Sequence, residues 1–120
     1  MKRFQTLIGL AGVAALVAAT PVLAHARLVS SNPAANATVK APATITLRFN
    51  ERLVAAFSKF ELSMPAHHMT IPVRTTVSSD GRQIVGTPSS ALANGDYTVT
   101  WTAAGADGHK MTGHFNFKVG

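Results

Sequence analysis

The chain has 120 residues, no cysteine, and eleven basic against five acidic residues, which gives a formal net charge of +6 at pH 7. Without cysteine there is neither a disulfide framework nor a thiolate, so a cysteine-ligated blue-copper site and a cysteine nucleophile are both excluded. The basic residues are scattered along the sequence without the clustering or aromatic interleaving typical of nucleic-acid binding, so we expect no nucleic-acid partner.

The first 24 residues predict a cleaved secretory signal peptide. Lys2 and Arg3 precede an apolar run over residues 7–19, Thr20-Pro21 ends the run, and Val22-Leu23-Ala24 suits a signal peptidase. The run is shorter than the about 20 apolar residues that cross a bilayer. We expect cleavage after Ala24 and a single exported domain over residues 25–120, while a start at Ala26 and an uncleaved anchor are the alternatives.

Beyond residue 25, apolar and polar residues alternate in short runs, as in antiparallel strands with one buried face. Ile45, Leu47 and Phe49 show this alternation, and so do Tyr97 and Trp101 in a later run. Pro, Gly, Asn and Asp separate the runs and favour chain reversal. The pattern predicts an all-β Greek-key sandwich or barrel of immunoglobulin-like size. We expect about seven strands, near residues 26–31, 44–50, 58–64, 71–78, 82–87, 96–104 and 111–119.

Cleavage after Ala24 would make His25 the first residue of the mature protein. Its free α-amine and its imidazole Nδ1 could then close a six-membered chelate ring on one metal ion. The amine has an ordinary pKa of about 7.7 to 8.0, so metal binding near neutral pH displaces a proton from part of the population. Cu(II) does this most readily among the divalent first-row metals.

A second cluster of donors is Asp107-Gly108-His109, which follows the predicted strand 96–104. Side chains two residues apart in an extended chain face the same side, so a carboxylate oxygen and an imidazole nitrogen are offered together. With the two nitrogens of His25 they make a set of three nitrogens and one oxygen, which suits tetragonal Cu(II). The alternative is an ordinary turn in which Asp107 only accepts backbone hydrogen bonds.

Several segments together resemble the CopC family of periplasmic copper proteins, and the similarity spans essentially the whole chain after residue 24. They are His25-Ala26-Arg27-Leu28, Ser31-Asn32-Pro33-Ala34, Leu47-Arg48-Phe49-Asn50-Glu51 and Asp107-Gly108-His109. The resemblance implies Cu(II) ligation by His25, Asp107 and His109, and a Greek-key barrel related to cupredoxins and immunoglobulin-like domains. It also implies a periplasmic location and a role in copper resistance or uptake, often beside a CopD-type inner-membrane partner.

The segment Met64-Pro65-Ala66-His67-His68-Met69 is a candidate Cu(I) site, because Cu(I) prefers thioether and imidazole ligands of this kind. Some CopC relatives use a methionine-rich loop here for Cu(I), whereas this segment has only Met64 and Met69. We therefore expect the Cu(I) site to be weaker than the Cu(II) site. Because Met64 is in phase with Phe60 and Leu62, a core side chain is its alternative role.

Other polar and aromatic residues have simpler expected roles. Glu51 could accept a hydrogen bond that orients His25, as outer-shell carboxylates do. His114 alternates outward with its neighbours, so we expect it to be solvated. Tyr97 and Trp101 are expected in the core.

We expect a soluble, monomeric copper carrier or buffer with no catalysis of its own. One alternative is an immunoglobulin-like structural or interaction module with incidental histidines. The other is a copper oxygenase that uses an N-terminal histidine chelate. Asp107 would occupy the coordination position that such an oxygenase leaves open for oxygen, and residues 25–120 leave little room for a substrate surface.

Overall fold

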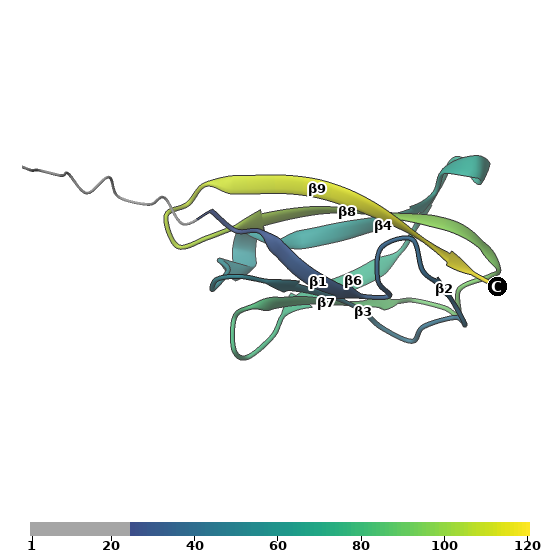
Figure 1. Ribbon diagram of the computed structural model, residues 1–120, viewed down its shortest axis with the longest axis horizontal. Helices are drawn as coiled ribbons and strands as arrows, with labels where there is room; N and C mark the ends of the chain where they lie inside the picture. Colours follow the sequence, from purple (N-terminus) through teal and green to yellow (C-terminus); the bar gives the residue numbers. More distant parts are fainter. Residues whose placement is uncertain (1–24) are drawn as a thin grey trace, which may run out of the picture.

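The computed structural model describes residues 25–120, which form two β-sheets packed face to face (Figure 1). The predicted signal peptide, residues 1–24, lies outside the described residues. One sheet has the order β1-β3-β7-β6, with β1 (Leu28–Asn32), β3 (Ile45–Phe49), β7 (Gln83–Pro88) and β6 (Val73–Val77). The other has the order β2-β9-β8-β4-β5, with β2 (Thr38–Val39), β9 (Lys110–Val119), β8 (Gly95–Ala104), β4 (Lys59–Met64) and β5 (Met69–Ile71).

Helical structure is limited to two short 3-10 turns, η1 (Ala55–Phe57) and η2 (Pro65–His67), within residues 25–120. Neither turn has the length or the apolar character that a membrane span needs. The turn η1 lies in the connection between β3 and β4. Every strand pair is antiparallel except β2 with β9, which is parallel.

The predicted all-β sandwich is confirmed, with nine strands among the described residues where the alternation predicted about seven. Each of the seven predicted runs overlaps most of one strand. The additional strands, β2 and β5, have two and three residues, which is too short for a period of two to be visible. Pro72 separates β5 from β6, because proline has no N–H to donate to a ladder.

The core lies between the sheets and uses the apolar residues of the alternating runs. Tyr97 and Trp101 are buried, as predicted, with 1% and 7% of their surface exposed. The Tyr97 hydroxyl donates a hydrogen bond of 2.6 Å to the Ala93 carbonyl, which satisfies the buried phenol. Phe49 of one sheet and Trp101 of the other meet edge to face, with ring centroids 5.1 Å apart. This aromatic contact joins the two sheets.

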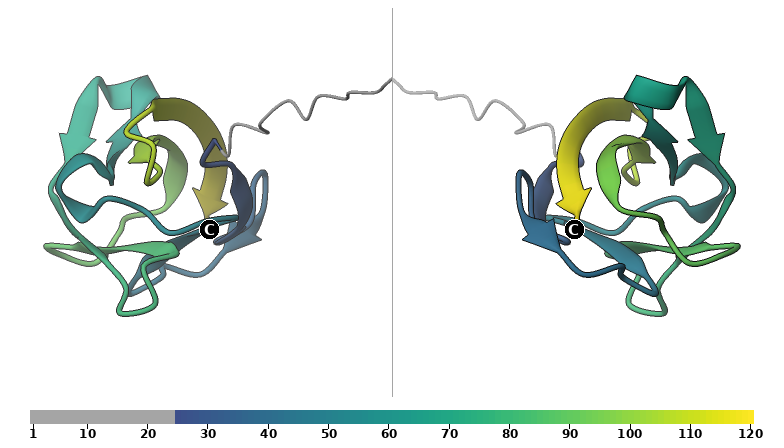
Figure 2. Two further views of the ribbon diagram at one scale, coloured as in Figure 1. Left: turned by 90° about the vertical axis from the view of Figure 1, so that its left-hand side faces the viewer. Right: turned by 90° about the vertical axis from the view of Figure 1, so that its right-hand side faces the viewer.

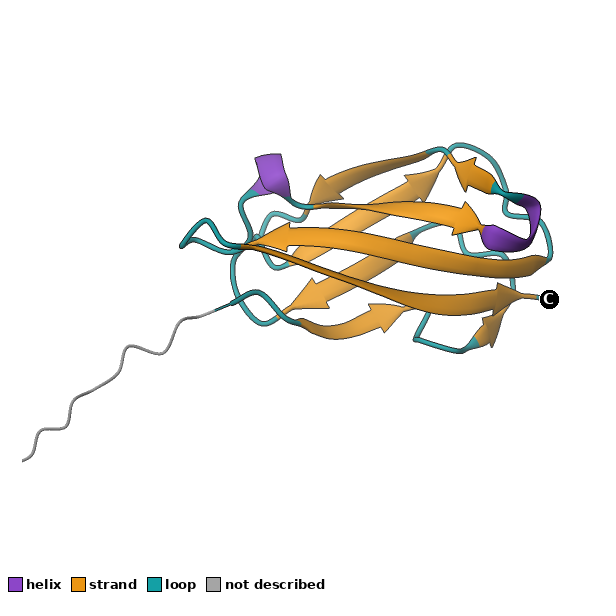
Figure 3. Cartoon of the chain, turned by 90° about the horizontal axis from the view of Figure 1, so that it is seen from above, coloured by secondary structure: helices purple, strands orange, loops and turns teal. Residues whose placement is uncertain are grey.

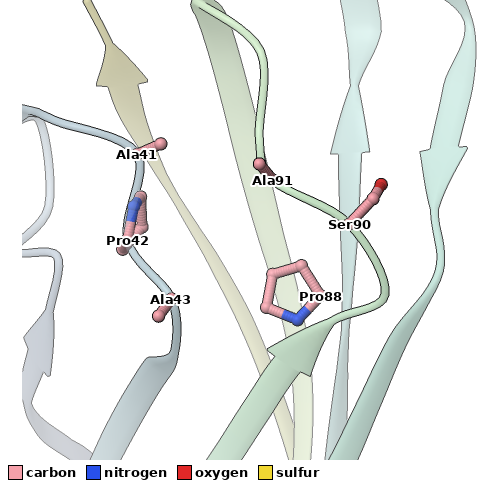
Figure 4. A pocket seen from close by; sticks show the side chains of 6 residues that line it. All are labelled: Ala41, Pro42, Ala43, Pro88, Ser90 and Ala91. Carbon is pink, nitrogen blue, oxygen red and sulfur yellow. The ribbon is translucent and has the colours of Figure 1, made fainter.

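The strand ends and their connections gather at two opposite ends of the sandwich (Figure 3). One end holds the N-terminal arm of residues 25–27, the β3–β4 connection with η1, and the β8–β9 loop. The other end holds η2 and the C-terminus. A hollow at this second end lies between the β2–β3 and β7–β8 connections (Figure 4). Its lining has no charged or metal-ligating side chain and consists of Ala41, Pro42, Ala43, Pro88, Ser90 and Ala91.

Gly86 of β7 leaves the space that Phe60 fills. A Cβ at this position would overlap the Phe60 ring and lie 2.8 Å from Cγ1 of Val73. We expect Gly86→Ala to lower the free energy of unfolding by about 1–3 kcal/mol, because overpacking forces neighbours off their preferred rotamers. Thermal or denaturant unfolding measures this. In the control, Gly120→Ala, the added Cβ meets nothing within 4 Å; equal stability of both variants would show that Phe60 moves aside without cost.

Candidate metal centre

The fold brings together three donors from the two ends of the described chain. His25, Asp107 and His109 each offer one ligand atom, and these atoms all lie within 4.8 Å of one another. The imidazole rings of His25 and His109 are edge to face, with centroids 5.4 Å apart and planes at 65°. Figure 2 shows this end of the sandwich in its left-hand view, where the N-terminal arm and the β8–β9 loop lie on the same side. The alternation of strands alone does not reveal this convergence.

A tight turn places Asp107 and His109 on one side. The backbone N–H of Gly108 donates to the Gly105 carbonyl at 2.9 Å, and Gly108 has a φ of +84°, in the left-handed region that favours glycine. The sequence predicted that the side chains of Asp107 and His109 face the same side because the backbone between them is extended. The side is shared, but the turn produces it.

The carboxylate of Asp107 holds His109 by two hydrogen bonds. Oδ1 accepts the backbone N–H of His109 at 3.0 Å, and Oδ2 lies 2.9 Å from Nδ1 of the His109 ring. The first of these bonds is the turn role that the sequence left as an alternative. The two nitrogens of an imidazole point away from each other, so Nδ1 is the ring nitrogen of His109 that faces the Asp107 carboxylate. The backbone N–H of His109, followed by its ring, holds the pKa of Asp107 below its usual value.

His25 is half-buried, and its Nδ1 is a buried nitrogen without a hydrogen-bond partner among the described residues. Buried polar atoms of folded proteins rarely lack a partner. A metal ion bound at this nitrogen would supply one, so the donor set fits a metal. The neighbouring Ala26 is 1% exposed, which anchors the arm to the core.

Asn50 lies at the same end of the sandwich, and the sequence did not predict a functional role for it. Its Nδ2 donates to the His25 carbonyl at 3.2 Å, and its Oδ1 accepts the backbone N–H of Arg27 at 2.7 Å. It lies in the Leu47–Glu51 segment that carried the family resemblance, which was the available signal. The adjacent Glu51 is half-buried, and its Oε2 is buried without a hydrogen-bond partner among residues 25–120.

The Met64–Met69 segment lies at the opposite end of the sandwich and divides into a buried and an exposed part. Met64 is 6% exposed and belongs to the core, which was its alternative role. Met69 is 50% exposed and pairs with Met64 across β4 and β5. His67 of η2 and His68, whose φ is +52°, are also exposed. The solvent-facing donors of the segment are therefore His67, His68 and Met69.

The basic residues, scattered in the sequence, gather in space at the end that holds His25. Strand registers and loops place six of the nine basic residues of the described chain there, against three acidic ones. The side chain of Lys110 lies over the ring of Phe57, with Nζ 4.9 Å from the centroid. The six basic residues are Arg27, Arg48, Arg52, Lys59, Arg82 and Lys110, and the acidic ones are Glu51, Asp80 and Asp107.

The fold and the cluster define a class: a small β-sandwich with a candidate metal site of histidine and carboxylate donors at one end. A model of the CopC domain matches residues 28–120, so the chain belongs to the CopC family.

Two relatives and one solved structure illustrate the match. Copper resistance protein C of Pseudomonas syringae pv. tomato is 43% identical over 102 residues, covering 80% of this chain and 81% of that protein. Copper transport protein CutJ of Bacillus subtilis (strain 168) is 29% identical over 99 residues, covering 81% of this chain but 18% of that protein. The crystal structure of PcoC, a methionine-rich copper resistance protein from Escherichia coli, has a TM-score of 0.76 at 36% identity. The match covers 81% of this chain and 100% of that chain.

Ser58 connects η1 to the strand that leads into the Asp107 turn. Its buried Oγ donates to the Val54 carbonyl at 2.8 Å and accepts the backbone N–H of Ala104 at 3.1 Å. We expect Ser58→Ala to lower the free energy of unfolding by about 1–3 kcal/mol, because the Ala104 N–H is left buried and unpaired. Denaturant unfolding checks this against Ser89→Ala, a change at an exposed serine. A loss no greater than that of the control would mean that water or a backbone shift replaces the Ser58 hydroxyl.

Proposed function

We propose that the chain is exported, cleaved after Ala24, and acts in the periplasm as a copper carrier or buffer. The observation that carries the proposal is the convergence of His25, Asp107 and His109 at one end of the sandwich, with Nδ1 of His25 unpartnered. Family membership supports copper as the metal, since the relative from Pseudomonas syringae is named for copper resistance.

The proposed ion is Cu(II), bound by the α-amine and Nδ1 of His25, a ring nitrogen of His109 and a carboxylate oxygen of Asp107. Oδ2 of Asp107 and Nδ1 of His109 lie 2.9 Å apart, so these two atoms can bind one ion as neighbouring ligands while Oδ1 keeps the backbone N–H of His109. This set of three nitrogens and one oxygen suits the tetragonal geometry of Cu(II). We also propose Glu51 as an acceptor that orients His25, and its buried Oε2 without a hydrogen-bond partner among the described residues supports this.

Binding without catalysis follows from the same donor set. A copper oxygenase needs an open coordination position for oxygen, and in this proposal Asp107 fills it. An immunoglobulin-like structural module with incidental histidines would not need three donors within 4.8 Å of one another. The soluble, monomeric mature protein would therefore bind copper and release it to a partner.

The proposed recipient is a CopD-type inner-membrane protein. The match to Copper transport protein CutJ covers only 18% of that protein, which supports the idea that a CopC domain works beside a larger part that moves copper. The end of the sandwich that holds His25 carries six basic and three acidic residues. We therefore propose that the recipient presents an acidic surface, because opposite charges speed association.

A separate Cu(I) site is proposed at the exposed side chains of His67, His68 and Met69. Their imidazole and thioether groups are suited to Cu(I). Met64 contributes through core packing instead, because it is 6% exposed. With only one solvent-facing thioether, this site is expected to be weaker than the Cu(II) site.

The first test is Cu(II) titration, with electron paramagnetic resonance, of protein exported with its own leader and confirmed by mass to begin at His25. We expect one tightly bound Cu(II) with a nitrogen-rich tetragonal spectrum. Affinity should fall as the pH drops below about 7.7, because the α-amine becomes protonated.

Two variants serve as the comparison: His25→Ala, and a protein that retains Ala24. Both should lose the tight site, because the first removes Nδ1 and the second turns the amine into an amide. Equal Cu(II) binding by all three proteins would contradict the proposed N-terminal site and leave the β-sandwich without an assigned ligand.

The Cu(I) proposal is tested by Met69→Leu in a competition assay with a chromogenic Cu(I) chelator. We expect weaker Cu(I) binding and unchanged Cu(II) binding, because Met69 and His25 lie at opposite ends of the sandwich. Met111→Leu is the matched control, since Met111 packs partly against the core at the other end. Unchanged Cu(I) binding in Met69→Leu would exclude Met69 as a ligand.

A further inference from the structure

The position of the N-terminal arm depends on hydrogen bonds that continue the β1–β3 pairing beyond the end of both strands. The strand register runs from Asn32 opposite Thr46 to Leu28 opposite Phe49, with an irregularity between Leu28 and Ser30. One further backbone bond joins the Asn50 N–H to the Arg27 carbonyl at 3.1 Å. His25 lies two residues beyond this point, where β3 has already ended.

The side-chain amide of Asn50 takes over where the backbone ladder stops. Its Oδ1 accepts the Arg27 N–H at 2.7 Å and its Nδ2 donates to the His25 carbonyl at 3.2 Å. One primary amide thus bonds both peptide groups that flank Ala26. In hydrogen-bonding terms it acts as an additional peptide unit of β3, which holds His25 in line with β1.

Asn50 is itself held by Arg82, which precedes β7, the neighbour of β3 on the side away from β1. Its backbone carbonyl accepts a hydrogen bond of 2.9 Å from Nη1 of Arg82. The Arg82 carbonyl in turn accepts the backbone N–H of Phe49 at 2.8 Å. A chain of hydrogen bonds therefore runs from the start of β7 through Asn50 to the peptide of His25.

We infer that Asn50 is a positioning residue for the copper site: its amide clamps the N-terminal arm so that His25 faces Asp107 and His109 before metal arrives. This inference rests on the proposed function, since it concerns the same site. A terminal residue is otherwise free to move, and ordering it on binding would cost affinity. The clamp supplies that order in advance.

The test is a pair of substitutions in the processed protein that begins at His25. Asn50→Ala removes both side-chain bonds, and we expect Cu(II) affinity to fall about 10- to 100-fold, as for other outer-shell changes. Asn50→Asp keeps the acceptor for the Arg27 N–H but turns an oxygen toward the His25 carbonyl. It should weaken Cu(II) binding while the Arg27 amide stays protected from hydrogen exchange.

A double-mutant cycle distinguishes positioning from a general effect on the fold. When His25 is already replaced by Ala, Asn50→Ala should cause no further loss of Cu(II) binding, because the clamp acts through His25. The matched control is Asn116→Ala on β9, where the exposed Asn116 Oδ1 accepts a 2.7 Å hydrogen bond from Thr98. The control should bind Cu(II) like the parent protein.

Parent-like affinity in Asn50→Ala, or an equal loss in the His25→Ala background, would overturn the inference. Hydrogen exchange at the Arg27 amide, followed by NMR without copper, gives a separate readout. If the parent protein binds no Cu(II), the proposed function fails, while faster Arg27 exchange in Asn50→Ala would still establish the clamp. Unchanged Arg27 exchange in that variant would exclude it.

Discussion

The edge-to-face contact between Phe49 and Trp101 joins the two sheets and sets the relation between the two halves of the proposed copper site. Phe49 pairs with Leu28 and directly precedes Asn50, so it fixes the strand that carries the N-terminal arm. Trp101 lies in the strand that ends at Ala104 and leads into the Asp107 turn. Gly113 opposite Trp101 leaves room for the indole, since a Cβ there would overlap it. The spacing of donors from distant parts of the sequence thus depends on aromatic packing in the core.

Both proposed histidine ligands are held by a neighbour through their backbone, which leaves ring nitrogens for copper. Oδ1 of Asp107 accepts the backbone N–H of His109, while Asn50 holds the backbone carbonyl of His25 and leaves Nδ1. A site ordered in this way binds metal without a large ordering cost. Asp107 and His109 are also exposed at the end of the sandwich, so an ion can enter and leave without unfolding the core. Both properties suit a carrier.

The sequence predicted most of the fold and the residues of the cluster, because period-two alternation and an Asp-Gly-His motif are local signals. It missed β2 and β5, whose two and three residues are too short to show alternation. It also missed Asn50, since the bonds of that residue join positions 23 and 25 residues apart and depend on strand register. The gathering of basic residues at one end was missed for the same reason. Register and sheet order decide such contacts, and neither is visible in a single sequence.

The two proposed copper sites lie at opposite ends of the sandwich, and this separation constrains how the protein handles the metal. The strands β8 and β9 that run between these ends have ten residues each; at about 3.3 Å per residue this is roughly 30 Å. An ion cannot move directly between hard and soft donors over that distance. Copper bound at the His25 end must dissociate before it reaches Met69, so each end would exchange copper with its own partner. The ends also differ in charge, with six basic residues near His25 and three elsewhere in the described chain, which favours different partner surfaces.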